Sequence, residues 1–173
     1  MLSRVMRLLA VASLVCAIPV AAQRAGTIEV GAFARYVDFD NTLPMGDDMD
    51  IGGRVGVYLE PALTLEVDLA RSSQSSVTYT PLHVRAVYNG SVSSRIEALV
   101  GGGYVRNWYG APYNAADQGL TMLLGMRFHV RDQLWLRLGA DLDFMFHTAD
   151  NSLFTFYNGN WGIHFGPSVR LNR

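Results

Sequence analysis

The chain has 173 residues, a formal net charge of −1, 50% hydrophobic residues and a mean hydropathy of +0.14. Its length suggests one domain, and its 14 basic residues are all arginines mixed among 15 acidic ones, so there is no basic patch of the kind that binds nucleic acid. Beyond the N-terminal segment, no stretch approaches the roughly 18 consecutive apolar residues of a transmembrane helix.

The first 22 residues have the pattern of a secretory signal peptide. Two arginines give a positive start, an apolar core spans residues 8–18, and residues 20–22 (VAA) form a small-residue cleavage site. The only cysteine, Cys16, lies within this segment. The sequence therefore predicts an exported mature chain, residues 23–173, without cysteine and with a net charge of −3 from 12 arginines and 15 acids.

The mature chain contains eight segments in which apolar and polar residues alternate with a period of two, as in β-strands. In chain order they are 27–39, 51–60, 62–70, 77–88, 95–107, 119–130, 134–146 and 161–172. The clearest is 134–146 (LWLRLGADLDFMF), in which one face is wholly apolar. At about 3.3 Å per residue this segment is long enough to cross a bilayer at a tilt.

The connections between these segments alternate between short and generally longer ones. The short ones are Glu60-Pro61, residues 89–94, which begin with the hairpin turn signal Asn89-Gly90, and residues 131–133. Outer-membrane barrels show this asymmetry, with short periplasmic turns and longer external loops. An even number of strands then places both termini on the periplasmic side.

Alternation alone does not decide which face lies inside, because a soluble lipocalin-like barrel has the same period. Three features favour the membrane barrel. Glycines fall on the charged phase, which suits a narrow lumen filled by large side chains. The apolar phase becomes aromatic toward the strand ends, as in interfacial girdles, and the charged phase mixes arginines with carboxylates, as in packed ion pairs. We therefore expect an all-β fold, an eight-stranded antiparallel up-and-down transmembrane β-barrel.

Charged residues of the inward phase are predicted to form a network in the lumen. The predicted lumen charge network is Glu29, Arg35, Arg54, Glu66, Asp68, Arg85, Arg95, Glu97, Arg127, Arg137, Asp141, Asp143 and Arg170, with Glu60, His83, His129 and His164 on the same phase. The predicted aromatic rim is Tyr36, Tyr88, Tyr104, Trp108, Phe146 and Trp161. We interpret the network as packed ion pairs that fill the lumen, because eight strands enclose only enough room for side chains. The alternative is a narrow ion path.

The signal peptide, the eight segments, glycine-rich pieces such as 98–104 (ALVGGGY) and the final GIHFGPSVRLN resemble the OmpA-type outer-membrane β-barrel domain, within the broad group of small barrels and porin-like surface antigens. The resemblance covers the whole mature chain. It implies a bacterial outer-membrane monomer in contact with membrane lipid and lipopolysaccharide and inserted by the outer-membrane assembly machinery. The chain departs from the family at residues 171–173 (LNR), where such barrels usually carry an aromatic residue that this machinery recognises.

The predicted function is a structural or surface-interaction role without catalysis and without cofactor, with a narrow passive channel as the alternative. A lipid A-modifying barrel enzyme and a soluble periplasmic binder are further alternatives. A hydrolase would need a histidine that polarises a serine. The candidate groupings, His147 with Asp150 and Ser152, and His164 with Ser168, do not match the His-x-Ser element of lipid A deacylases.

Two loop clusters allow a ligand but have simpler interpretations. Asp47, Asp48 and Asp50 lack the spacing of a calcium-binding loop, so we expect a solvated acidic loop and no metal site. The aromatic stretch around Trp108 and Tyr113 is predicted to anchor the rim, although aromatic residues are also favoured at interfaces with a surface ligand.

Overall fold

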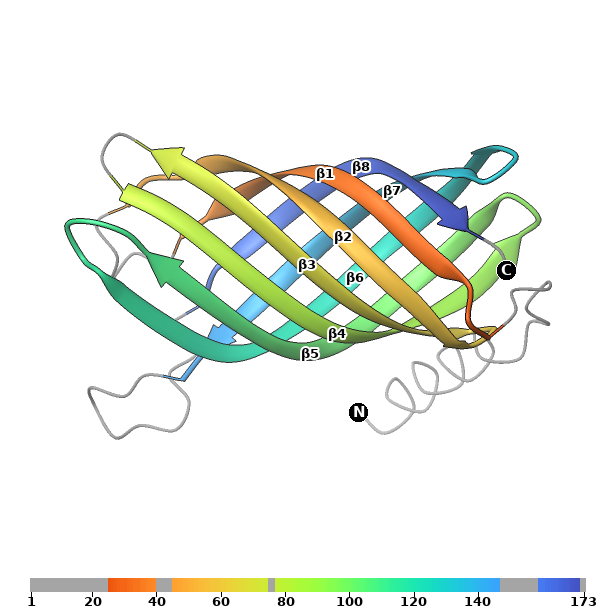
Figure 1. Ribbon diagram of the computed structural model, residues 1–173, viewed down its shortest axis with the longest axis horizontal. Helices are drawn as coiled ribbons and strands as arrows, with labels where there is room; N and C mark the ends of the chain where they lie inside the picture. The colour runs from red at the N-terminus through yellow and green to blue at the C-terminus, as the bar shows by residue number, and fades with distance from the viewer. Residues whose placement is uncertain (1–24, 40–44, 75–76, 147–158, 172–173) are drawn as a thin grey trace, which may run out of the picture.

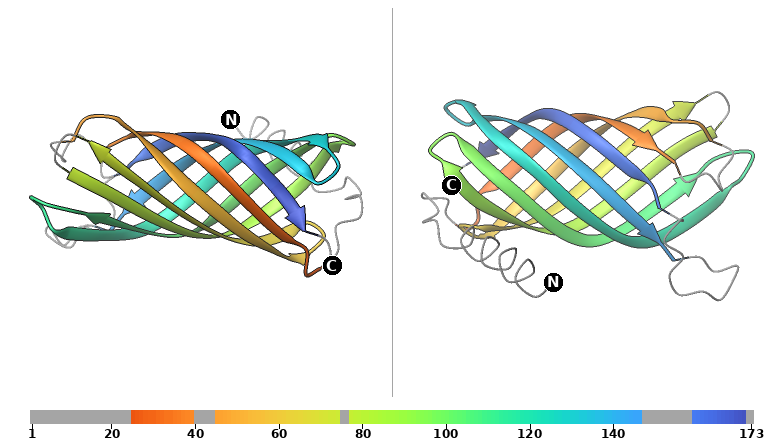
Figure 2. Two further views of the ribbon diagram at one scale, coloured as in Figure 1. Left: turned by 45° about the horizontal axis from the view of Figure 1, so that its top comes forward. Right: turned by 180° about the vertical axis from the view of Figure 1, so that it is seen from behind.

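The computed structural model describes residues 25–39, 45–74, 77–146 and 159–171, which form one closed barrel of antiparallel strands (Figures 1 and 2). Each strand pairs with its neighbours in the chain, and β1 pairs with β8 to close the barrel. The strands are β1 (Ile28–Asp38), β2 (Asp48–Glu60), β3 (Leu63–Gln74), β4 (Val77–Ser93), β5 (Ile96–Tyr109), β6 (Ala115–Arg131), β7 (Leu134–Met145) and β8 (Trp161–Leu171). The predicted signal peptide lies outside the described residues, and within them no helix is long and apolar enough to cross a membrane.

Short turns gather at one end of the barrel, which we call the short-turn end. They lie at residues 61–62, 94–95 and 132–133. A shift of register precedes each of them, between Tyr58 and Glu60, Ser91 and Ser93, and His129 and Arg131. Such bulges bend the strand and increase its twist as it enters the turn. The opposite end, with the generally longer connections, is called the loop end.

The apolar phase faces outward and the charged phase faces inward. Along β8 exposed and buried residues alternate without exception, so that Phe165 is 54% exposed while the neighbouring His164 is 1% exposed. Large hydrophobic side chains are exposed on all eight strands. Soluble monomers rarely expose apolar patches larger than a few hundred Å², and a closed sheet with an apolar exterior is one of the two structures that can span a bilayer. This arrangement excludes the lipocalin-like assignment, in which the apolar phase would line the interior.

The hairpin between β4 and β5 differs from the sequence prediction. Asn89 and Gly90 are not the turn: they continue β4 and pair with Leu99 and Ala98 of β5. The turn comes five residues later, at Ser94 and Arg95. The physical reason is tertiary, because the side-chain amide of Asn89 is buried in the lumen and donates to the Thr64 hydroxyl at 2.8 Å.

The acidic segment before β2 also differs from the predicted solvated loop. Strand β2 begins at Asp48, and Asp50 is fully buried, where it accepts from Arg35. Asp48 accepts a hydrogen bond from the backbone N–H of Met49 at 2.7 Å, and Asp47 accepts from the Tyr36 hydroxyl. The three carboxylates therefore have separate roles.

Apolar side chains occupy the lumen at two levels. Val37, Phe39, Tyr79 and Tyr109 form one cluster toward the loop end, and Val87, Leu99 and Leu123 form another on the wall of β4 to β6. Lumen glycines make room for bulky neighbours: a Cβ on Gly139 would lie 2.5 Å from Nε2 of His164. The interior is thus a packed core of mixed polarity, as expected for eight strands.

Candidate functional site

The lumen charge network begins at the short-turn end, around Glu29 and Glu97. Nη2 of Arg127 lies 3.1 Å from Glu29, and Nη1 lies 3.1 Å from Glu97. Arg170 donates from Nε to Glu29 at 3.2 Å and from Nη1 to Glu97 at 3.0 Å. Its guanidinium also stacks 4.0 Å from the ring centroid of Trp135. Two arginines and two glutamates thus form a closed square of ion pairs.

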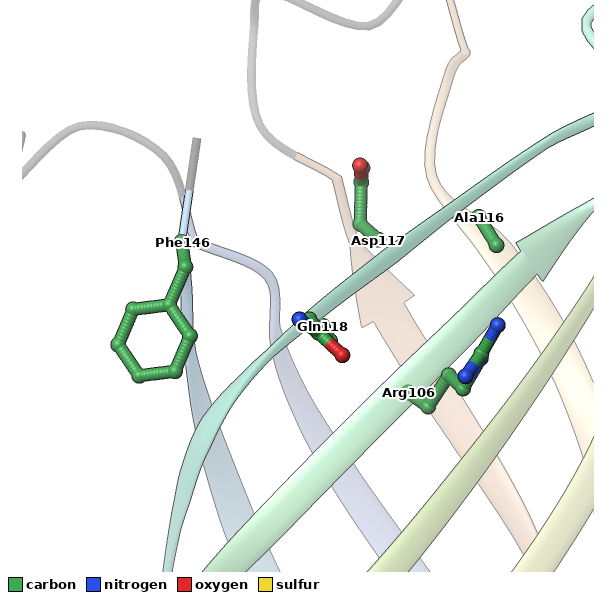
Figure 3. Close-up of a pocket in the computed structure, with 5 residues that line it drawn as sticks. All are labelled: Arg106, Ala116, Asp117, Gln118 and Phe146. Carbon is green, nitrogen blue, oxygen red and sulfur yellow. The ribbon is translucent and has the colours of Figure 1, made fainter. Parts of the chain in front are cut away.

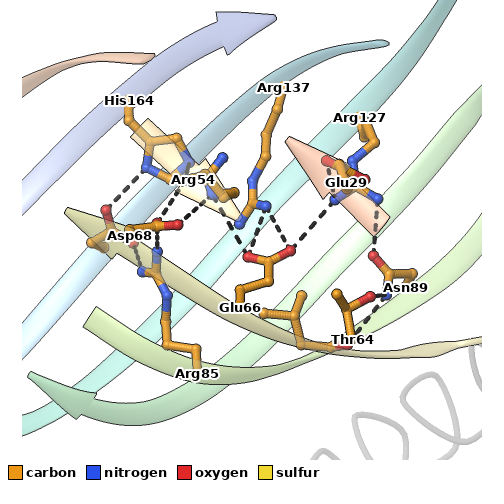
Figure 4. A network of polar contacts seen from close by, with 12 residues as sticks. Glu29, Arg54, Thr64, Glu66, Asp68, Arg85, Asn89, Arg127, Arg137 and His164 are labelled. Atoms are coloured by element: carbon orange, nitrogen blue, oxygen red, sulfur yellow. Dashed lines mark hydrogen bonds and ion pairs between the residues drawn. The ribbon is translucent and has the colours of Figure 1, made fainter. Parts of the chain in front are cut away.

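Glu66 is the centre of the network (Figure 4). Both of its carboxylate oxygens accept from Nη1 of Arg137 at 2.9 Å. Nη2 of Arg127 lies 3.5 Å away and Nε of Arg54 lies 3.7 Å away. Glu66 is 1% exposed. One buried carboxylate therefore faces three guanidinium groups that come from β2, β6 and β7.

Asp68 and Asp141 continue the network toward the loop end. Asp68 accepts two hydrogen bonds from Arg54, at 2.6 and 2.8 Å, in the bidentate geometry that strengthens such pairs. Arg85 lies between the two aspartates and donates to each of them. Asp141 also contacts Nδ1 of His164 at 3.0 Å. These residues join β2, β3, β4, β7 and β8.

The outermost level holds Arg35, Asp50, His83 and Asp143. Arg35 donates from Nη2 to Asp50 at 2.6 Å, and Nη1 lies 3.8 Å from Asp141 of the level below. Nε2 of His83 lies 3.1 Å from Asp143. Because His83 is on β4 and Asp143 is on β7, this contact crosses the lumen.

Several other ion pairs also cross the lumen between strands that are not neighbours in the sheet. Arg137 and Glu66 join β7 to β3, Arg170 and Glu97 join β8 to β5, and Arg85 and Asp141 join β4 to β7. The buried carboxylates in the described residues are Glu29, Asp50, Glu66, Asp68, Glu97, Asp141 and Asp143, and the buried guanidinium groups are those of Arg35, Arg54, Arg85, Arg127, Arg137 and Arg170. The near balance of seven against six lets almost every buried charge lie beside an opposite one.

The structure places twelve of the thirteen predicted network residues inside the barrel and leaves one outside. Arg95 is not a lumen residue: it is exposed in the β4–β5 turn, because the hairpin forms beyond the Asn-Gly pair. Glu60 is exposed beside the first short turn, and His129 is half-buried and contacts the carbonyl oxygen of Asp132 at 2.9 Å. The bulge in β2 removes Glu60 from the regular alternation, since it pairs with Leu63, whereas His129 lies just before the bulge in β6 and keeps its regular pairing with Trp135.

Sequence reasoning missed several uncharged lumen residues that take part in the network. Nη1 of Arg127 donates to the Tyr58 hydroxyl at 2.9 Å and to Oδ1 of Asn89 at 3.0 Å. Near the loop end the Tyr79 hydroxyl donates to Asn107 at 3.1 Å. The alternation alone could have predicted that Tyr58 and Asn107 face the lumen. Each lies an even number of residues from a charged inward residue of its own strand, Arg54 in β2 and Glu97 in β5.

The predicted aromatic rim is mostly at one end. Tyr36, Tyr104, Trp108 and Trp161 point outward near the loop end, and the rings of Tyr36 and Trp161 lie 5.9 Å apart. Phe146 follows β7 at the same end, held by a 2.9 Å backbone hydrogen bond to Gln118. Tyr88 is separate from these: it pairs with Leu63 and Val100 toward the short-turn end.

The residues considered for catalysis are not arranged at a lipid-facing site in the described structure. His164 is buried in the lumen, with Nδ1 toward Asp141 and Nε2 3.4 Å from the guanidinium of Arg54. Ser168 is buried on the same strand. His147, Asp150 and Ser152 lie outside the described residues. Among the described residues, no cluster of histidine, cysteine and acidic side chains could hold a metal ion.

Solved structures of membrane barrels share this architecture. The N-terminal barrel domain of OprF from Pseudomonas aeruginosa aligns with 86% of this chain and 100% of its own, at 14% identity and a TM-score of 0.62. Neisserial surface protein A aligns with 84% of this chain and 99% of its own, at 17% identity and a TM-score of 0.65. The protein has the fold of a small outer-membrane β-barrel.

The similarity to these solved structures indicates the fold and not the function. A de novo designed transmembrane β-barrel aligns with 86% of this chain and 98% of its own, at 17% identity and a TM-score of 0.57. A designed barrel thus matches almost as well as the bacterial proteins, and a shared fold does not carry a shared activity. Searches against protein-family profiles and curated proteins match nothing.

Proposed function

We propose that the protein resides in the bacterial outer membrane as a closed, non-catalytic barrel with a structural or surface-interaction role, surrounded by membrane lipid and lipopolysaccharide. The single observation that carries the proposal is the set of ion pairs across the lumen, from Arg170 and Glu97 near the short-turn end to His83 and Asp143 near the loop end. These contacts fill the space through which a solute would pass. Whatever the protein contacts then lies outside the barrel.

The proposed orientation places the short-turn end in the periplasm and the loop end outside the cell. The short and longer connections support it, because outer-membrane barrels place short turns in the periplasm. Insertion by the outer-membrane assembly machinery is part of the same proposal. In this orientation a surface ligand would contact the loop end.

A narrow passive channel is the second candidate, and one observation favours it. Within the described residues Nε of Arg85, Nε of Arg127, and Nε and Nη2 of Arg137 are buried without a hydrogen-bond acceptor. Buried donors of this kind are usually satisfied by ordered water. A file of water along these arginines would be the start of an ion path.

Planar-bilayer recordings distinguish the two candidates. The closed barrel predicts no discrete current steps from the reconstituted protein, and the same result after Asp141→Asn. The channel predicts steps in the original protein whose size or ion selectivity changes when Asp141 or Arg137 is neutralised. Discrete steps with that dependence would overturn the closed-barrel proposal.

A further inference from the structure

Near the loop end, a polar pocket lies beside Arg106 and Gln118, which are exposed on the outer face of the barrel (Figure 3). The pocket has a volume of about 220 Å³ and lies where the end of β5, the start of β6 and the end of β7 meet. Its lining residues are Arg106, Ala116, Asp117, Gln118 and Phe146. A guanidinium on the outer face of a membrane barrel is costly at mid-bilayer and close to neutral at the interface. Arg106 is therefore placed at the depth of lipid headgroups.

The side chains of the pocket are held in position by their neighbours. The Arg106 guanidinium lies 5.3 Å from the ring centroid of Trp108, a cation–π distance. Within the described part of the chain, Arg106 has no carboxylate within ion-pair distance. The carbonyl oxygen of the Gln118 amide accepts from the Tyr104 hydroxyl at 3.0 Å, which directs the N–H₂ group of the amide toward other acceptors. Arg106 and Gln118 are opposite each other in the β5–β6 pairing.

We infer that this pocket binds the phosphate of an outer-leaflet glycolipid such as lipid A. An arginine offers a planar fork of donors that matches phosphate oxygens, and the Gln118 amide adds a further donor beside it. Trp108 and Tyr104 are both exposed on the same outward face and supply the aromatic surface typical of membrane interfaces. The inference rests on the proposed orientation, which places the loop end in the outer leaflet.

The experiment is a titration of lipid A into phosphatidylcholine vesicles that hold the refolded protein. The measured quantity is the temperature at which the fast-migrating folded band is lost on a gel, as a function of lipid A content. We expect lipid A to raise this temperature. Arg106→Gln should need about tenfold more lipid A for half of the effect, as expected for the loss of one charge-assisted contact. Arg131→Gln is the matched control, since Arg131 is exposed at the short-turn end and pairs only with Asp132 among the described residues.

The outcomes separate this inference from the proposed function. Equal lipid A titrations for the original protein and Arg106→Gln would overturn the site, and so would an equal stabilisation by inorganic phosphate in vesicles without lipid A. Because Arg106 faces outward, the variant should still form the folded band in phosphatidylcholine alone. Failure of the original protein to form that band would instead count against the barrel itself.

Discussion

At the scale of the residue, the lumen shows how a charged interior is made stable. Removing a carboxylate or a guanidinium from water costs several kcal/mol, and an opposite charge with good geometry offsets that cost. Glu66 is the most connected example, with Arg54, Arg127 and Arg137 all within 4 Å. If Glu66 were neutral, Arg137 would lose its one carboxylate partner among the described residues, whereas Arg54 would keep Asp68, and Arg127 would keep Glu29 and Glu97.

The corresponding prediction concerns Glu66→Gln. We expect it to lower the free energy of unfolding by about 3 kcal/mol, because removing one partner of a buried pair exposes the other to the full desolvation cost. Urea titration of the protein in detergent or vesicles measures this quantity. Glu60→Gln is the matched control: Glu60 is exposed beside a turn, and a change there should be within about 0.5 kcal/mol. Equal effects of the two substitutions would contradict a network centred on Glu66.

At the scale of the element, the period of two predicts which segments are strands, but local turn chemistry fails to predict where one of them ends. The Asn89-Gly90 pair is a strong hairpin signal, yet its asparagine contacts Thr64 and Arg127, which are distant in sequence. Asp50 is a similar case. It follows a run of loop-forming residues, and only its pairing with Arg35 across β1 and β2 places it in the lumen.

An insertion experiment tests the position of this hairpin. Four residues, Gly-Ser-Gly-Ser, inserted between Ser94 and Arg95 lengthen an exposed turn and should be tolerated, since doubling a loop costs only about 0.6 kcal/mol. The same insertion between Asn89 and Gly90 interrupts a paired strand and should abolish the boiling-dependent gel shift. If only the second variant kept the shift, the turn would lie at Asn89-Gly90 after all.

For the whole molecule, the sequence predicts the architecture more fully than it predicts the function. Closure into a barrel follows from the need of each strand in lipid for two partners, and the placement of twelve network residues follows from their phase. Cross-lumen partners such as Arg85 and Asp141 do not follow, because strand tilt and register decide which residues meet. The pocket at Arg106 cannot be predicted from the sequence either, because the alternation of polar and apolar residues does not show which side chains meet on the outer face.

The most direct test of the closed membrane barrel is the mobility of the purified protein on a gel with and without boiling, after refolding in detergent. A closed barrel with an apolar exterior resists unfolding in detergent until it is heated, so we expect a band that migrates differently before boiling, together with β-rich circular dichroism. A protein that stays soluble without detergent and shows no shift on boiling would contradict a membrane barrel with an apolar exterior. The apolar phase would then face inward, and the ion pairs described here would not fill a lumen.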